Sequence, residues 1–191
     1  MKLSILICSL KERQYFLDRL LSLIQPQVTN DVEILVNVDD RQKSIGTKRN
    51  ELLTQAQGDY VCFVDDDDLV PGYYIKEILT TLDNAPEQLD CIGINGIITV
   101  DSLNPKVFKH SILYTSWYEA NNIYYRHPNH WNPVKREIAL QAMFPEINWG
   151  EDHEYSKRIQ PFLKTEAVIE RIMYYYLSSR TLSVASQRRN Q

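Results

Sequence analysis

The first half of the chain alternates between apolar runs and amphipathic segments. Three apolar runs have the length and residue types of buried strands, and they cover residues 3–8, 32–38 and 60–64. Segments with apolar residues at helical spacing follow each run, over residues 12–24, 44–56 and 71–82. Ser44 can cap the second segment, and Pro71 opens the third. This β-α-β-α-β-α order with short connections predicts a mainly parallel sheet flanked by helices.

The second half has a weaker pattern. Strands are expected over residues 89–100 and 107–114, joined through the turn at Asn104 and Pro105, and a helix is expected over 133–143. Two more apolar segments follow, at 167–169 and 172–177. We therefore predict a single α/β domain over residues 1–191, with a small second β element after the main sheet.

Composition narrows the class of protein. A net charge of -4 and a pI of about 5.6 make nucleic acid or an anionic membrane an unlikely partner. Cys8, Cys62 and Cys91 lie in apolar runs without metal-binding or redox spacing, so we expect buried free thiols in a reducing compartment. No apolar run has the length of a membrane span or signal peptide. A cytoplasmic location is expected, and the oligomeric state stays open.

Polar residues follow each of the first three predicted strands. They are Ser9 after the first, Asp39 and Asp40 after the second, and Asp65, Asp66, Asp67 and Asp68 after the third. Because the carboxyl ends of parallel strands meet at one edge of a sheet, these groups should converge where ligands usually bind. Each close pair of like charges costs ~4 kcal/mol at an intermediate dielectric. We therefore predict a divalent cation and a phosphorylated ligand there, in preference to a solvated acidic turn.

Four segments, in order and spacing, resemble family 2 glycosyltransferases with the GT-A fold. They are residues 4–9, 33–40, 48–68 and 149–158. The third is the most specific, because it joins an Arg-Asn pair at Arg49 to the acidic run. The resemblance covers nearly the whole chain. It implies a Rossmann-like GT-A domain in which residues 1–100 are the nucleotide-binding half and residues 101–191 are the acceptor-binding half and tail.

The resemblance implies a metal-dependent, inverting transfer of a sugar from a nucleotide-sugar, with a UDP-sugar favoured, to the hydroxyl of a glycan or other small molecule. Mn²⁺ or Mg²⁺ would neutralise the diphosphate leaving group. Alternation along the third strand would turn Asp65 and Asp67 toward the nucleotide, so both are candidate metal ligands, Asp67 the more direct one. Asp65 and Asp66 are also candidates for binding the nucleotide-sugar.

Other matching positions complete the expected nucleotide-sugar site: Ser9, Asp39, Asp40, Arg49 and Trp149. Asp39 would bind the base, although the family has one residue fewer before this aspartate, so Asp40 could hold the role. Arg49 should pair with a carboxylate or phosphate, whereas Lys48 fits a solvated helix face. Plainer interpretations are turn residues for the aspartates, a loop serine, and core packing for Trp149. His130 and Trp131 are weaker candidates for lining the donor sugar.

The same resemblance makes Asp152 the general base, with Glu151 as the alternative. Acidic residues at a helix N-terminus also stabilise its dipole, which is the competing explanation. Many relatives carry a metal-assisting His in the tail, where this chain has Ser179 or Arg180. Two other functions remain open. One is a non-catalytic nucleotide-sugar binding module, and the other is a nucleotidyltransferase, which the glycine-free loop at residues 9–13 disfavours.

Overall fold

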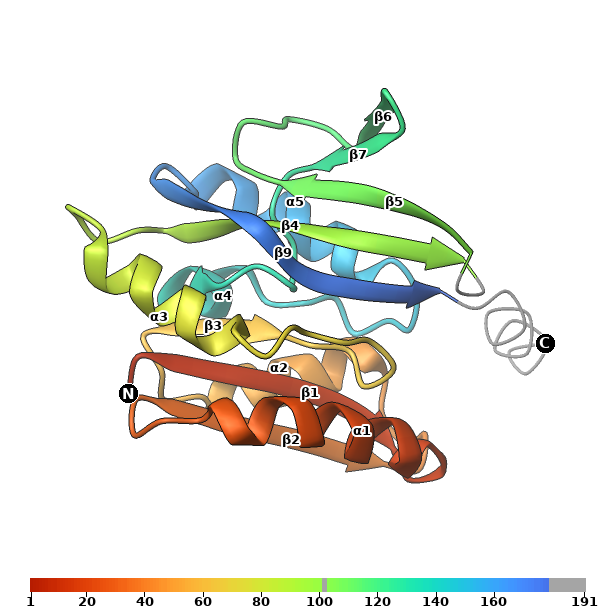
Figure 1. Cartoon of the computed structure of the whole chain (residues 1–191). Helices are drawn as coiled ribbons and strands as arrows, with labels where there is room; N and C mark the ends of the chain where they lie inside the picture. The colour runs from red at the N-terminus through yellow and green to blue at the C-terminus, as the bar shows by residue number, and fades with distance from the viewer. Residues whose placement is uncertain (101–102, 179–191) are drawn as a thin grey trace.

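A mixed sheet with helices on both faces forms the frame of the molecule (Figure 1). The computed structural model describes residues 1–100 and 103–178, and within them nine strands belong to this sheet. The strand order is β2 (Val32–Asp39), β1 (Leu3–Leu10), β3 (Tyr60–Phe63), β8 (Val134–Lys135), β4 (Cys91–Val100), β5 (Leu103–His110), β7 (Ile123–Arg126) and β6 (Tyr118–Ala120). The last strand, β9 (Glu166–Ser178), pairs with β4. The tail positions Ser179 and Arg180 lie outside the described residues.

The first three strands have the predicted parallel arrangement. Strand β1 is parallel to β2 and to β3, with Leu3 opposite both Val32 and Tyr60. Beyond β3 the sheet is mixed, because β8 is antiparallel to β3 and β4, and β5 is antiparallel to β4, whereas β9 is parallel to β4 and β7 is parallel to β5. The expected small second β element is therefore the far edge of the same sheet, formed by β7 and β6.

Helices cover both faces of the sheet, as the apolar runs predict. They are α1 (Gln14–Ile24) and α3 (Tyr74–Asn84) on one face, and α2 (Ile45–Gln55), α4 (Arg136–Ala142) and α5 (Glu151–Ile159) on the other (Figure 1). Short 3-10 helices precede α1 (η1, Lys11–Arg13) and follow α1 (η2, Gln25–Gln27) and α5 (η3, Gln160–Phe162). Each face has its own apolar core, represented by Leu20 and Ile78 on one side and by Leu53 and Ile159 on the other.

Strand β5 begins at Leu103, because Leu103 already pairs with Val100 of β4, so the prediction of a turn at Asn104 and Pro105 is wrong. Three other elements differ from the predicted bounds for local reasons. Helix α3 starts at Tyr74, because Tyr74 donates its N–H to the Pro71 carbonyl in a preceding turn. Helix α4 starts at Arg136, because Val134–Lys135 pairs with β3 and β4. The two last apolar segments are one strand, β9, whose register against β4 shifts near Asn95.

The start of α2 is fixed in two ways. The Ser44 hydroxyl accepts the Thr47 N–H at 3.1 Å, which is the predicted N-cap. Gly46 packs so closely on the loop after α4 that a Cβ atom at this position would lie 1.8 Å from the Pro145 carbonyl oxygen. Since α2 carries charged residues toward the sheet edge, this docking also positions the site described below.

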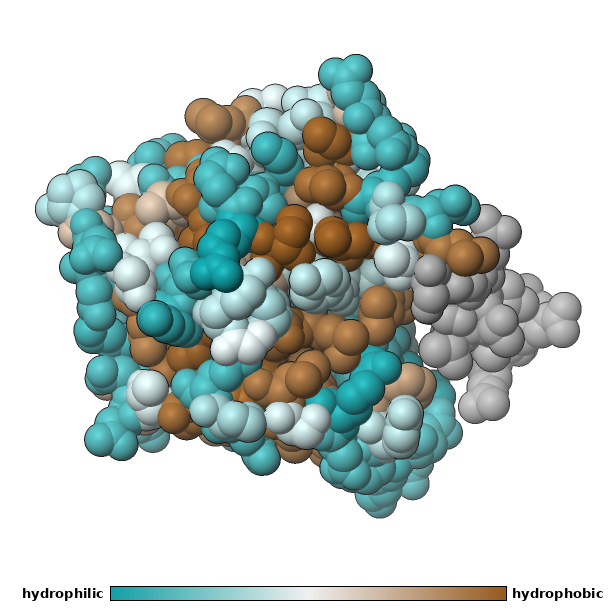
Figure 2. All heavy atoms as spheres, viewed as in Figure 1, coloured by the Kyte–Doolittle hydropathy of each residue, from teal (hydrophilic) through white to brown (hydrophobic). Residues whose placement is uncertain are grey.

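Apolar and hydrophilic side chains occupy different parts of the visible surface. On the face seen in Figure 2, apolar side chains gather near the middle of the molecule and hydrophilic side chains dominate its periphery. Cys8, Cys62 and Cys91 are buried free thiols, which confirms the prediction. Among the helices of residues 1–100 and 103–178, none has both the length and the apolar character needed to cross a membrane.

Candidate active site

A cavity of about 440 Å³ lies at the carboxyl ends of β1 and β3, where the sequence predicted a ligand site. Its lining includes carboxylates and cations in close proximity, namely Asp65, Asp66, Asp67, Arg13, Arg41, Lys43, Lys48 and Arg49. Ser9, Asn148 and Trp149 also line it. Trp149 is 55% exposed, so core packing does not explain this side chain.

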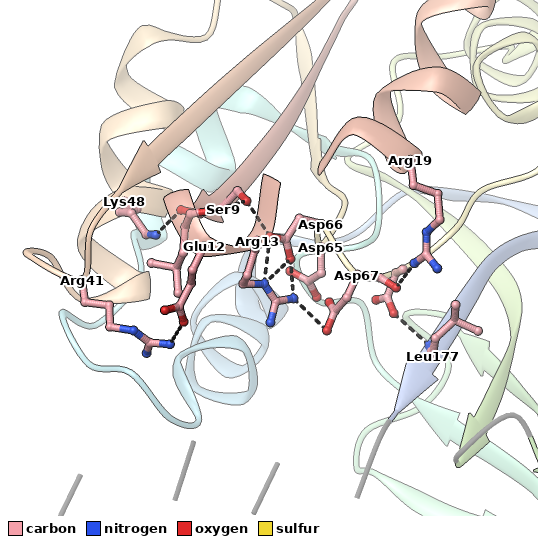
Figure 3. Close-up of polar contacts among 12 residues, drawn as sticks. Ser9, Glu12, Arg13, Arg19, Arg41, Lys48, Asp65, Asp66, Asp67 and Leu177 are labelled. Carbon is pink, nitrogen blue, oxygen red and sulfur yellow. Dashed lines mark hydrogen bonds and ion pairs between the residues drawn. The ribbon is translucent and has the colours of Figure 1, made fainter. Parts of the chain in front are cut away.

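The acidic turn, residues 65–68, closes one side of the cavity (Figure 3). Strand β3 ends at Phe63, and Asp68 donates its N–H to the Asp65 carbonyl across the turn. The argument from strand alternation is therefore wrong, because residues 65–68 lie in a turn after the strand and not in the strand itself. Asp65, Asp66 and Asp67 all line the cavity instead.

Arg13 joins two carboxylates of the acidic turn. Its Nε donates to both oxygens of Asp66 at 2.9 and 3.0 Å, and its Nη2 lies 2.8 Å from Asp67 Oδ2 (Figure 3). The Ser9 hydroxyl also donates to Asp66, at 2.6 Å. Sequence reasoning did not single out Arg13 and missed this contact. The only available signal was its position three residues after the end of β1.

Asp65 turns toward the opposite side of the cavity. It accepts hydrogen bonds from Arg49 Nη2 at 2.9 Å and Trp131 Nε1 at 3.1 Å, and its Oδ2 lies 3.2 Å from His130 Nε2. Burial alone would raise the pKa of Asp65, but Arg49 and His130 hold it well below its ordinary value. The expected pairing of Arg49 with a carboxylate is therefore confirmed, and His130 and Trp131 are direct partners in the site.

Arg49 connects the acidic turn to α5. Its side chain is buried and packs against the rings of Phe63 and Phe144, at 5.0 and 5.6 Å from their centres, and its Nε lies 3.5 Å from Glu151 Oε1. Burial raises the pKa of Glu151 in spite of the arginine. One guanidinium thus holds two carboxylates from distant parts of the chain.

The aspartates after β2 occupy different environments. Asp39 is 9% exposed and accepts a hydrogen bond from Lys48 Nζ at 2.8 Å, which lowers the pKa of Asp39 against the effect of burial. The Asp40 side chain is 62% exposed and lies 3.9 Å from Lys11 Nζ. Asp39 thus lies behind the cavity lining, in contact with Lys48, whereas Asp40 lies at the surface, and neither is among the described lining residues.

Lys48 is buried, so its interpretation as part of a solvated helix face is wrong. Besides Asp39, its Nζ donates to the Ser9 carbonyl at 2.8 Å (Figure 3). The signal was present in the sequence, because Lys48 lies at helical spacing from Ile45 and Leu52 on the buried face of α2. The charge of the residue obscured its position in the pattern.

Strand β9 holds the acidic turn in place through hydrogen bonds. Asp68 is fully buried and accepts hydrogen bonds from the Tyr174 hydroxyl and the Leu177 N–H, both at 2.8 Å. The Tyr174 hydroxyl in turn accepts the Asp65 N–H at 3.1 Å. Burial and the neighbouring charges raise the pKa of Asp68 well above its ordinary value. Asp68 therefore anchors the turn and does not cap α3.

The first turn of α5 reaches the site through Glu151. Gly150, with φ of 76°, starts the helix, and Glu151 follows it with an exposed fraction of 7%. Asp152 is half-buried, and neither Asp152 nor Glu151 is among the described lining residues of the cavity, although Glu151 contacts the lining residue Arg49. The charge of Asp152 acts instead on Arg126 at the end of β7. The two adjacent carboxylates therefore point to different surroundings.

Comparison with solved structures defines the fold class. Crystal structures of S. aureus TarS residues 1–349, one with UDP-GlcNAc and one with UDP, each match with a TM-score of 0.71 and 18% identity. The matches cover 93% and 94% of this chain, but 59% and 61% of those chains. This chain therefore spans about three fifths of the structures it matches, and its fold is that of the GT-A glycosyltransferases. No curated protein matches.

The sequence profile described as glycosyl transferase family 2 matches residues 18–145, which is more than half of the chain. The chain belongs to that family.

Proposed function

We propose that this chain transfers a sugar from a nucleotide-sugar, with a UDP-sugar as the favoured donor, to an acceptor hydroxyl with inversion at the anomeric carbon. The observation that carries the proposal is the cavity that places the acidic turn against several cations at the strand ends of a family 2 chain. UDP and UDP-GlcNAc in the similar TarS structures support the class of donor.

The cations of the cavity suit the donor's diphosphate. Arg13, Arg41 and Lys43 line the cavity, and the side chains of Arg41 and Lys43 are 50% and 44% exposed. One guanidinium group can donate two parallel hydrogen bonds to a phosphate. This favours Arg13 and Arg41 over Lys43 for this role. Asp39 is the proposed partner of the base, and Asp40 is less suited because it lies at the surface.

The acidic turn has the chemistry to hold Mn²⁺ or Mg²⁺. Within the described ranges, no group of three or more His, Cys, Asp and Glu side chains could hold a metal by itself. Mg²⁺ commonly binds through one or two carboxylates plus substrate phosphates, so the residues fit a cation shared with the donor. Asp67 is the better ligand, because both oxygens of Asp65 already have protein partners. When bound, the ion would neutralise the charge of the leaving diphosphate.

Asp152 is the proposed general base. Its carboxylate would accept the proton of the acceptor hydroxyl while the hydroxyl oxygen bonds to the anomeric carbon and the bond from that carbon to the diphosphate breaks. Glu151 is less suited to this role, since it is buried against Arg49. The nucleoside diphosphate then leaves with the bonding electron pair.

Two variants test the assignment, with exposed Glu154→Gln in the same helix turn as the matched control. Asp152→Asn should retain UDP affinity by calorimetry and lose turnover of UDP-sugars. Asp67→Ala should lose the Mn²⁺-dependent part of UDP affinity. Unchanged turnover would remove Asp152 from the mechanism, and undiminished Mn²⁺ dependence would remove Asp67.

The same assays separate the two alternative functions. A chain that binds UDP yet turns over no UDP-sugar, with or without candidate acceptors, is a binding module. Release of pyrophosphate from a nucleoside triphosphate in place of sugar transfer identifies a nucleotidyltransferase.

A further inference from the structure

Arg126 has an unusual setting at the end of β7. Its guanidinium lies 4.5 Å from the centre of the Trp117 ring and 5.6 Å from that of Tyr124. The side chain is half-buried, and burial lowers the pKa of Arg126. Because two aromatic rings flank the guanidinium, its plane is fixed while its hydrogen-bonding edge is left available.

Three other buried or half-buried cations near the site have carboxylate partners, and Arg19 donates a hydrogen bond to the Asp67 backbone carbonyl at 2.6 Å. Arg13 pairs with Asp66 and Asp67, Lys48 with Asp39, and Arg49 with Asp65, all at distances of 2.5–2.9 Å. In the part of the chain that the structure describes, Arg126 makes no ion pair within 4 Å and no side-chain hydrogen bond. A partly desolvated cation without an anionic partner is costly, which points to a ligand that supplies the anion.

The position of Arg126 places that ligand on the acceptor side. Trp117 contacts the His153 ring edge-on at 4.7 Å, next to the proposed base. The charge of Asp152 acts on Arg126, as does the Tyr176 hydroxyl. Tyr176 in turn experiences the charges of the acidic turn. Arg126 therefore lies near α5, within electrostatic reach of the groups that would flank the transferred sugar.

We propose that Arg126, held flat by Trp117, binds a phosphate or carboxylate group of the acceptor. The inference rests on the proposed function and names the class of its acceptor, an anionic molecule with a free hydroxyl. A fixed guanidinium edge matches the two oxygens of either group in a bidentate contact.

The test measures acceptor binding to protein that is already saturated with UDP and Mn²⁺, so that the nucleotide site is filled. Glycerol 3-phosphate is titrated against glycerol, and glucuronate against glucose, by calorimetry. The anionic member of at least one pair should bind at least about tenfold more tightly. The phosphate and carboxylate pairs identify which group the site prefers.

Variants then assign the preference to Arg126. Arg126→Ala should lose about tenfold or more in affinity for the anionic compound, and Arg126→Lys should lose less, because a lysine keeps the charge but not the planar pair of donors. Arg171→Ala is the matched control. Arg171 also stacks on a tyrosine ring, at 3.6 Å from the centre of Tyr73, but it has Glu77 as its ion-pair partner. Its removal should leave acceptor binding unchanged.

The outcomes are distinct. Equal affinity for charged and neutral compounds, or a preference that survives in Arg126→Ala, overturns the inference while UDP binding still supports the proposed function. Wild-type affinity in Arg126→Lys overturns the bidentate contact. Absence of UDP binding ends the proposed function and this inference together. Melting temperatures identify any variant that fails to fold, and the lysine variant then decides the result.

Discussion

Replacing Arg49 with alanine should destabilise the protein more than replacing any surface arginine. Arg49 is 3% exposed, and its guanidinium pairs with Asp65 at 2.9 Å and with Glu151 at 3.5 Å. Its removal leaves two carboxylates in a poorly hydrated region and opens a space beside the rings of Phe63 and Phe144. Removing one partner of a buried ion pair typically costs about 3–5 kcal/mol.

Urea unfolding of wild type and variant at pH 7 measures this loss. For a domain of this size, melting temperature falls by about 2–4 °C per kcal/mol, so a decrease of about 6–20 °C is expected. The matched control is Arg158→Ala. Arg158 forms an exposed pair with Glu154 at 3.4 Å, and its loss should cost less than about 0.5 kcal/mol.

The pH dependence of the stability loss in Arg49→Ala tests whether unpaired buried charge is its cause. Arg49 lowers the pKa of Asp65 in the folded state, so this contribution to stability is present above an unfolded-state pKa of about 3.9 and is lost as the pH falls below it. Without Arg49, Asp65 and Glu151 can bind protons in mildly acidic solution, which removes the buried charge. The stability difference between wild type and variant should therefore shrink from pH 7 to pH 5. A loss below about 1 kcal/mol, or a difference that does not shrink, would refute the reasoning.

Two further predictions concern packing and titration. Gly46→Ala should lower the free energy of unfolding by about 1–3 kcal/mol through its clash with the Pro145 carbonyl, whereas Gly72→Ala, with no atom within 4 Å of the new Cβ, should change it by less than about 0.5 kcal/mol. Equal effects in urea unfolding would contradict the clash. Burial lowers the pKa of His110 to about 3, so stability should fall as the pH falls from about 6.5, by up to about 1.4 kcal/mol per pH unit. His110→Gln should flatten this dependence between pH 6.5 and 4.5, and an unchanged slope would argue against a neutral, buried His110.

The first half of the fold could be predicted because its pattern is local. The apolar run that begins at Leu3 is buried on both faces by helices that lie next to it in the sequence. The second half depends on partners far apart in the chain. Nothing near Glu166–Ser178 indicates that it pairs in parallel with Cys91–Val100, and the two-residue strand Val134–Lys135 exists only because β3 and β4 lie on either side of it.

The candidate site shows the same division. The rule that strand ends gather at one edge found Ser9 and the acidic turn. It could not find Arg13, whose contact depends on how a short 3-10 helix turns the side chain back toward Asp66. The partners of Asp65 in the irregular segment before α4 were weak candidates, because no periodicity sets their side-chain directions. These positions are determined by tertiary contacts rather than by local sequence.

The supports under the acidic turn have a consequence for how the protein is made. Tyr174 and Leu177 are separated from Asp68 by 106 and 109 residues, and both hold that buried carboxylate. A nascent chain that has emerged only as far as its acidic turn therefore lacks the two groups that hold Asp68. The part of the molecule assigned to donor binding is encoded early but completed late, and it becomes competent only when the last described strand has docked.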